Sequence, residues 1–263
     1  MTLWEDKEAN LIESLRGRAR WDDRPIRLFP DAEETQKVVT SIVDDEIWKT
    51  EWVDSSSKSD PPPDFYSESQ KLMIEVMRVD DHAFEQNGRI QNPANQRTRM
   101  RAKELMEALH INLRPGGQLV INSPTDLPSL EDHNYRYYKS NFKRVIEKHI
   151  EKIPTYKSNH PDCKLIFFVF DESSMYFQTD RPNQTIKMGE QICGKPHQWY
   201  LDKAFIDVFI NSGIDYLIWF TPNKHVETRG LPIKLTLACV FDCNRVDEKS
   251  IDYPEDYIMS TEE

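Results

Sequence analysis

The chain of 263 residues has little glycine, and this scarcity limits the nucleotide-binding loops that it can build. Only 8 glycines occur, neither GxGxxG nor GxxxxGK[ST] is present, and Gly116-Gly117 is the only adjacent pair. Loops that hold phosphates on bare backbone amides depend on such glycines. The sequence therefore argues against an enzyme built around a glycine-rich nucleotide loop.

Long apolar runs are also missing. The longest ones, residues 165–170 and 216–220, are far shorter than the ~20 residues that cross a bilayer, and no cationic and apolar leader opens the chain. The four cysteines fit no common zinc spacing, and Cys239 and Cys243 lie in an apolar segment, as small buried side chains do. We therefore expect a reduced, cytoplasmic protein that does not span a membrane.

The chain is acidic overall, because 45 acidic and 34 basic residues give a net charge of −11. Residues 247–263 hold seven acids and one lysine, so this acidic tail carries more than half of the excess. Hydrophobic residues make up 38% of the chain, which is enough for a core. We expect a globular domain over residues 1–246 and a separate tail. Because so much of the acidity lies in the tail, it does not exclude a nucleic-acid partner.

Hydrophobic periodicity predicts helices that alternate with short strands. The expected helices cover residues 5–20, 31–46, 93–113, 134–153 and 199–211. The expected strands cover residues 47–53, a hairpin over 66–79, and residues 117–122, 164–171, 216–220 and 233–241, with residues 173–198 irregular. Asp31 is the expected N-cap of the second helix, with Glu34 as its capping-box partner. This alternation predicts a single-domain α/β sandwich with a mixed central sheet.

Residues 63–82 place carboxylates in and beside a strongly apolar strand. Because side chains alternate between the faces of a strand, Lys71, Glu75 and Met77 share one face. Asp64 lies across the expected hairpin from Glu75. Two neighbouring carboxylates need a cation, and a divalent metal such as Mg²⁺ prefers oxygen ligands and activates water for attack on a phosphodiester.

The same segment resembles the PD-(D/E)xK nuclease superfamily, whose core runs helix, three-strand meander, helix, strand. In that core Pro-Asp opens the second strand and the acid of the ExK triplet lies on the third, which correspond here to Asp64 and Glu75. The resemblance covers residues 31–122 and implies a restriction-endonuclease-like fold, Mg²⁺ or Mn²⁺ bound by Asp64 and Glu75, and hydrolysis of DNA or RNA. It also implies that Glu34 supplies the helix acid that some members carry.

The motif lysine is absent, because Met77 occupies its position two residues after Glu75. In active members that lysine positions the attacking water, which a thioether cannot do. Lys71 lies on the same face but ~20 Å along the strand from residue 77. Some members take the basic group from the following helix. The basic residues of the expected helix 93–113, which also suit phosphate contacts, are Arg97, Arg99, Arg101 and Lys103.

Two other interpretations stay open. The missing lysine favours a catalytically inactive nuclease fold that serves as a binding or scaffold subunit of a prokaryotic defence or phage system. Alternatively, the chain is an unrelated α/β protein in which Asp64 starts a strand and Glu75 faces water or pairs with Lys71. Residues 80–82 are expected to form a polar turn. A second basic row with tyrosines, over residues 135–148, is a further candidate for contacts with nucleic acid.

Overall fold

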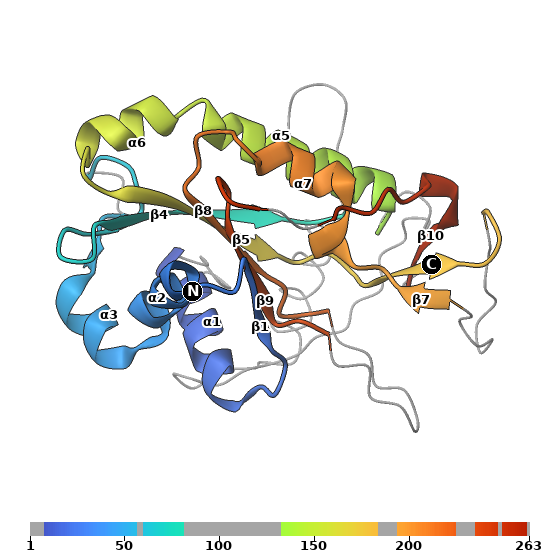
Figure 1. Ribbon diagram of the computed structural model, residues 1–263, viewed down its shortest axis with the longest axis horizontal. Coiled ribbons are helices and arrows are strands. Elements are labelled where there is room, and N and C mark those ends of the chain that lie inside the picture. The colour runs from blue at the N-terminus through green and yellow to red at the C-terminus, as the bar shows by residue number, and fades with distance from the viewer. Residues whose placement is uncertain are drawn as a thin grey trace, which may run out of the picture.

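The computed structural model describes residues 8–56, 60–81, 133–183, 194–224, 235–246 and 249–261. In this part of the chain, helices pack on both faces of a seven-stranded mixed sheet (Figure 1). The strands, in their spatial order, are β1 (Ile26–Phe29), β9 (Ala238–Asp242), β8 (Tyr216–Phe220), β5 (Lys164–Asp171), β4 (Leu72–Val79), β3 (Phe65–Ser67) and β2 (Val53–Asp54). The predicted α/β architecture with a mixed central sheet is confirmed.

Parallel pairing joins the central strands of this sheet. β4 pairs with β5 and β5 pairs with β8 in parallel, whereas β2, β3 and β4 form an antiparallel meander. β5 is buried on both faces, as its continuous apolar sequence predicts. The predicted hairpin over 66–79 and the strands over 164–171 and 216–220 are confirmed. The last strand of the sheet begins at Ala238, later than predicted.

Three helices cover one face of the sheet and lie below it in Figure 1: α1 (Glu8–Trp21), α2 (Glu33–Val43) and α3 (Asp45–Glu51). Apolar side chains three and four residues apart on α1 and α2 pack against the even-numbered residues of β4. This core includes Leu11, Ile12, Leu15, Val38, Ile42, Leu72, Ile74 and Val76. The predicted helix over residues 5–20 is thereby confirmed over its described part, from Glu8 onward.

The opposite face is covered by α5 (Tyr135–Ile150), α6 (Ile153–Asn159) and α7 (Lys203–Phe209) (Figure 1). Their aromatic side chains pack against the odd-numbered residues of β4 and β5. This core includes Met73, Met77, Phe142, Ile146, Tyr156, Phe167, Phe205, Phe209 and Trp219. The predicted alternation of the β4 side chains is confirmed, and it directs Glu75 toward α5 and α6.

A smaller sheet of β10 (Ile258–Ser260), β6 (Tyr176–Thr179) and β7 (Gly194–Pro196) adjoins the first. The prediction of an irregular segment over 173–198 is wrong at β6 and β7. Gly194 is required there, because a Cβ at this position would lie 2.4 Å from the carbonyl oxygen of Gln178.

Two 3-10 turns, η2 (Trp199–Leu201) and η3 (Glu255–Tyr257), precede α7 and β10. Part of the acidic tail thus forms a strand, and the domain division at residue 246 stays a prediction.

The predicted strand over residues 47–53 is wrong, because most of this segment is the helix α3. The Asp44 side chain caps that helix by accepting hydrogen bonds from the backbone amides of Glu46 and Ile47. Trp52 follows the helix and donates its indole N–H to the carbonyl oxygen of Ser41 at 2.7 Å. Capping and aromatic packing therefore outweigh the alternating pattern that suggested a strand.

The predicted N-cap of α2 is also wrong. Ala32, not Asp31, occupies the cap position, and Oγ1 of Thr35 accepts the hydrogen bond of the Ala32 amide at 3.2 Å. Asp31 instead accepts a hydrogen bond from the side chain of Gln36. Thr35 is therefore the capping-box residue of α2, a role that the sequence pattern assigned to Glu34.

The predicted helix 93–113 and strand 117–122 lie outside the described residues, as do Arg97, Arg99, Arg101 and Lys103. Among the described elements, α5 and α6 follow β4 along the chain, and β5 then pairs in parallel with β4. None of the described helices is both long and apolar enough to cross a membrane. The cytoplasmic location stays a prediction.

Candidate functional site

The hairpin of β3 and β4 brings the two predicted carboxylates together. Phe65 pairs with Ile74, so Asp64 and Glu75 are the next residues of this antiparallel register. Oδ2 of Asp64 accepts a hydrogen bond of 2.7 Å from the backbone amide of Val76. The carboxylate of Asp64 therefore reaches the β4 backbone directly beside Glu75.

The local environment makes the charge of Asp64 costly. Burial, followed by the negative charge of Glu75, raises the pKa of the Asp64 carboxyl to about 7, although the amide of Val76 favours the ionised form. Glu8 on α1 and Asp54 at the end of β2 add smaller repulsions that also raise this pKa. Around Asp64 the site gathers negative charge from three elements, and no cation of the described residues is among the main contributions to the shift of its pKa.

Glu75 is buried, with 6% of its surface exposed, and its two oxygens differ in their contacts. Oε1 accepts a hydrogen bond of 2.8 Å from the hydroxyl of Tyr156 and lies 3.0 Å from Nδ1 of His149. Oε2 is buried and has no hydrogen-bond partner among the described residues. An orphaned carboxylate oxygen is expensive in a protein interior, so Glu75 has the capacity for one more ligand.

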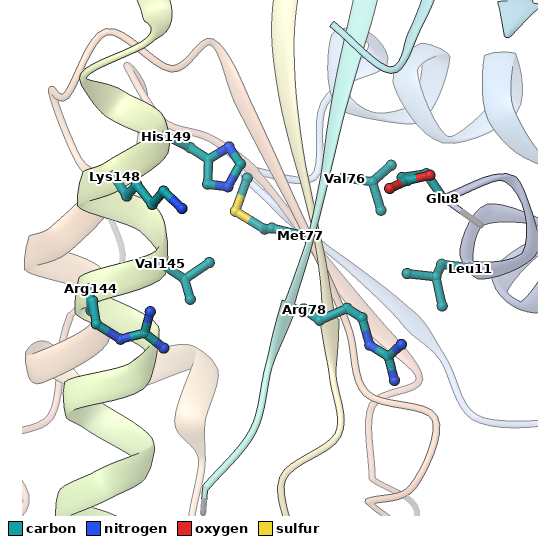
Figure 2. A pocket seen from close by; sticks show the side chains of 9 residues that line it. All are labelled: Glu8, Leu11, Val76, Met77, Arg78, Arg144, Val145, Lys148 and His149. Carbon is teal, nitrogen blue, oxygen red and sulfur yellow. The ribbon is translucent and has the colours of Figure 1, made fainter. Parts of the chain in front are cut away.

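A cleft of about 290 Å³ opens beside these carboxylates, where β4 runs between α1 and α5 (Figure 2). Val76 and Met77, the two residues after Glu75, line it together with His149, whose ring contacts Glu75. Figure 2 shows Lys148 and Arg144 on the α5 side of the cleft and Glu8 on the α1 side. Asp64 and Glu75 do not line the cleft themselves, but the cleft begins at the residues next to Glu75 and carries basic side chains that suit an anionic ligand.

Glu34 does not join this site. Its carboxylate lies 3.6 Å from the guanidinium of Arg245, which follows β9, and both side chains are more than half exposed. β9 and β4 are separated by two strands, or about 14 Å at the usual strand spacing. The helix acid near Asp64 is instead Glu8 of α1, which the sequence pattern did not single out.

No known protein family, curated protein or solved structure matches this chain.

Lys71, the other basic residue weighed for the missing motif lysine, is in the tight turn before β4. Its backbone has a φ of 52°, and its carbonyl oxygen accepts a hydrogen bond from the amide of Lys164. Met77, in contrast, faces α5 within the cleft, beside Lys148 and His149 (Figure 2). Among the described residues, α5 supplies Arg144 and Lys148 to the cleft that Met77 lines, and Lys71 does not line it.

The predicted polar turn after β4 contains a deeply buried carboxylate, Asp81. Its Oδ2 accepts hydrogen bonds from the amide and hydroxyl of Ser174 and from the hydroxyl of Tyr176, and its Oδ1 lies 3.1 Å from Nδ1 of His133. Burial alone would raise the pKa of this carboxyl, but these hydrogen bonds and the charge of His133 hold it well below its usual range. A turn residue in the sequence is thus part of a packed polar network.

Lys224 is at the centre of that network, where the parallel strands β4, β5 and β8 end. Its ammonium donates to Oγ of Ser173 and to the carbonyl oxygen of Ser174, and it lies 3.7 Å from Oδ2 of Asp171. Burial lowers the pKa of Lys224, while Asp171 and Asp81 oppose that change. The hydroxyl of Tyr138 also donates to Asp171. Because the donors and acceptors satisfy one another, we assign this network to stability.

Proposed function

We propose that the chain is a divalent-metal-dependent phosphodiesterase that acts on DNA or RNA, with Mg²⁺ or Mn²⁺ bound by Asp64 and Glu75. The observation that carries this proposal is the pair itself. Burial and the Glu75 charge raise the pKa of Asp64 to about 7, and the buried Oε2 of Glu75 has no hydrogen-bond partner in the described part of the chain. A cation between the carboxylates would remove both costs. The donor set fits, because these metals prefer carboxylate oxygens and retain several waters.

The order of elements supports a PD-(D/E)xK-like core, as the sequence resemblance implies. The helices α2 and α3 precede the meander of β2, β3 and β4, then α5 and α6 cross over to the parallel strand β5. The second strand follows Pro63-Asp64 and the third carries Glu75. In this proposal the second helix and fourth strand of the core correspond to residues 135–150 and 164–171. The predicted helix 93–113 and strand 117–122 lie outside the described residues.

The chain's own residues hold the reacting groups in place. The hydroxyl of Tyr156 and the ring of His149 orient Glu75, and the amide of Val76 orients Asp64. When bound, the metal lowers the pKa of a coordinated water and neutralises charge on the scissile phosphate. Lys148 lies beside Met77 in the cleft and supplies the positive charge that Met77 lacks (Figure 2). Its role would be to bind a phosphate oxygen.

Met77 also supports a second candidate function, that of a catalytically inactive nucleic-acid-binding or scaffold subunit. The motif position is occupied by a thioether that neither donates nor accepts a proton in catalysis. Basic side chains in the cleft would still bind a phosphate backbone without cleaving it. The two functions differ in one measurable property, which is hydrolysis at saturating metal.

The test is cleavage of labelled single-stranded DNA, duplex DNA and RNA by the full chain in Mg²⁺ or Mn²⁺. We expect cleavage that Glu75→Gln and Asp64→Asn reduce at least 100-fold and that Lys148→Ala reduces about 10-fold or more, whereas Glu34→Gln leaves it unchanged. Binding of Mn²⁺ followed by calorimetry gives an independent readout, which Glu75→Gln should weaken. Metal and nucleic-acid binding without cleavage would favour the inactive subunit. Failure of Mn²⁺ to bind at Asp64 and Glu75 would overturn the metal site.

A further inference from the structure

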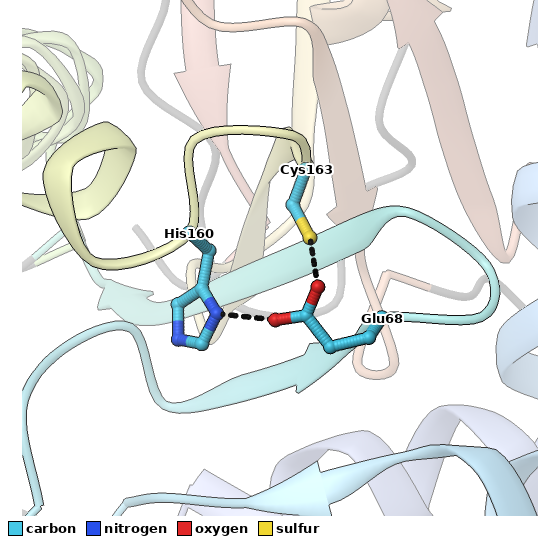
Figure 3. Close-up of side chains that lie close together, drawn as sticks. All are labelled: Glu68, His160 and Cys163. Atoms are coloured by element: carbon cyan, nitrogen blue, oxygen red, sulfur yellow. Dashed lines mark hydrogen bonds and ion pairs between the residues drawn. The ribbon is translucent and has the colours of Figure 1, made fainter.

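Three potential metal ligands of different chemical type meet at the other end of β4 (Figure 3). Glu68 lies in the turn between β3 and β4, and His160 and Cys163 lie in the loop between α6 and β5. Nδ1 of His160 is 2.9 Å from Oε1 of Glu68, and Sγ of Cys163 is 4.0 Å from Oε2 of the same carboxylate. One ligand atom from each residue lies within 4.8 Å of the others.

The backbone and packing fix the orientation of two of these side chains. The ring of His160 stacks on Tyr66 with a centroid distance of 4.1 Å. The amide of His160 donates to the carbonyl oxygen of Tyr156, and the amide of Cys163 donates to that of His160. Cys163 is buried, with 2% of its surface exposed, so its thiol has few other positions. The nitrogen and sulfur ligands are therefore preorganised, and the longer, exposed Glu68 approaches them from solvent.

The composition of this group distinguishes it from the all-oxygen pair of Asp64 and Glu75. Imidazole nitrogen, thiolate sulfur and carboxylate oxygen together suit Zn²⁺, whereas Mg²⁺ rarely accepts sulfur. Three protein ligands also leave a fourth tetrahedral position for water. Among the described residues, the Cys163 thiol makes only long contacts, with the carbonyl oxygen of Ser67 at 3.9 Å and with Oε2 of Glu68 at 4.0 Å.

We propose that Glu68, His160 and Cys163 form a second metal site that binds one Zn²⁺ ion. This site joins the β3–β4 turn to the α6–β5 loop. The hairpin carries Asp64 and Glu75, and α6 carries Tyr156, which holds Glu75. A metal here therefore fixes the spacing between the carboxylates and the helix that orients them, so its role is structural. The proposal of a Zn²⁺ site does not rest on the proposed phosphodiesterase activity.

The experiment is a titration of the metal-free full chain with Co²⁺, followed by displacement with Zn²⁺ in the presence of a competing chelator. A bound thiolate gives Co²⁺ a near-ultraviolet charge-transfer band, and tetrahedral geometry gives strong visible bands. We expect one equivalent of Co²⁺ with both features. Because outer-shell changes alone cost about 10–100-fold in affinity, we expect Cys163→Ser and His160→Gln to weaken Zn²⁺ binding by about 100-fold or more.

Two controls separate this site from others. Asp162→Asn changes an exposed carboxylate between the ligands and should leave the spectrum and the affinity unchanged. Glu75→Gln should also leave them unchanged, even where it abolishes Mn²⁺ binding at the first site. A thiolate band that persists in Cys163→Ser, or equal Zn²⁺ affinity in the wild type and both ligand variants, would overturn the proposal. Circular dichroism of each variant establishes that it is folded.

Discussion

The hydroxyl of Tyr156 donates a hydrogen bond of 2.8 Å to Oε1 of Glu75 and thereby ties α6 to the centre of β4. Burial and the neighbouring Glu75 charge raise the pKa of this hydroxyl far above its usual value, so the hydroxyl keeps the proton that it donates to Glu75. The bond fixes one carboxylate oxygen and leaves Oε2 for another ligand. Tyr156 is therefore a positioning residue for Glu75.

Tyr156→Phe should destabilise the fold, because it removes a hydrogen bond to a buried carboxylate. A bond to a charged group contributes about 1.5–3 kcal/mol, so we expect the free energy of unfolding to fall by about 2 kcal/mol in urea denaturation. Glu75→Gln in the same background provides a double-mutant cycle. If the two changes are additive within about 0.5 kcal/mol, the side chains do not interact as described.

The raised pKa of Asp64 leads us to expect an unusual dependence of the free energy of unfolding on pH. Its carboxyl pKa is about 7 in the folded chain and near 3.8 when unperturbed, so the folded state retains a proton that the unfolded state releases. The contribution of Asp64 to stability is therefore present below about pH 4 and is lost as the pH rises toward 7. Asp64→Asn should remove this loss and make the metal-free chain more stable than the wild type at pH 8.

Urea denaturation between pH 4.5 and pH 8 measures this effect, with Asp162→Asn as the exposed control. Mn²⁺ should stabilise the wild type at pH 8 and have a much smaller effect on Asp64→Asn, since binding to the folded state alone raises stability. Parallel pH profiles for the wild type and Asp64→Asn would show that Asp64 ionises in the folded chain as it does in the unfolded chain.

Lys224→Met should be among the most destabilising single substitutions in the described part of the chain. Methionine preserves much of the packing against Tyr138 and Trp199 but removes the only cation near Asp171 that the structure describes. Removing one partner of a buried charge cluster costs about 3–5 kcal/mol. Thermal and urea unfolding measure the loss. Lys203→Met, at an exposed ion pair with Asp207, should change stability far less than Lys224→Met does.

Asp44→Ala tests the helix that the sequence pattern missed. The variant loses both hydrogen bonds from the first turn of α3, so we expect a destabilisation of about 1 kcal/mol. Asp31→Ala is the matched control, because Asp31 caps no helix in the structure and should change stability by less than about 0.5 kcal/mol. A larger effect at Asp31 than at Asp44 would contradict the observed caps. Equilibrium unfolding measures both.

Local sequence patterns predict the parts of this fold that depend on short-range order. The apolar run of β5 and the alternation in β4 are sufficient to define two central strands. The hairpin register then places Asp64 beside Glu75 before any coordinates are known. These predictions succeed because strand periodicity and hairpin pairing are properties of neighbouring residues.

Other parts of the site depend on contacts between distant residues and carry no local signal. Tyr156 and His149 reach Glu75 from helices more than 70 positions away in the sequence. Glu8 approaches Asp64 from α1, whereas Glu34, the acid in the expected position, faces Arg245. The prediction for residues 47–51 is wrong for a different reason. Their alternating pattern suggests a strand, but the cap at Asp44 and tertiary packing favour the helix α3.

The pairing of the edge strand β1 with β9 affects the order in which the sheet can form. Ile26 pairs with Ala238, so β1 leaves the ribosome long before its partner strand exists. Contacts between such distant segments slow folding and leave strand edges uncovered while synthesis proceeds. The amino-terminal strand therefore cannot pair until residues 238–241 have been made, so this edge of the sheet is completed only after most of the chain has been synthesised.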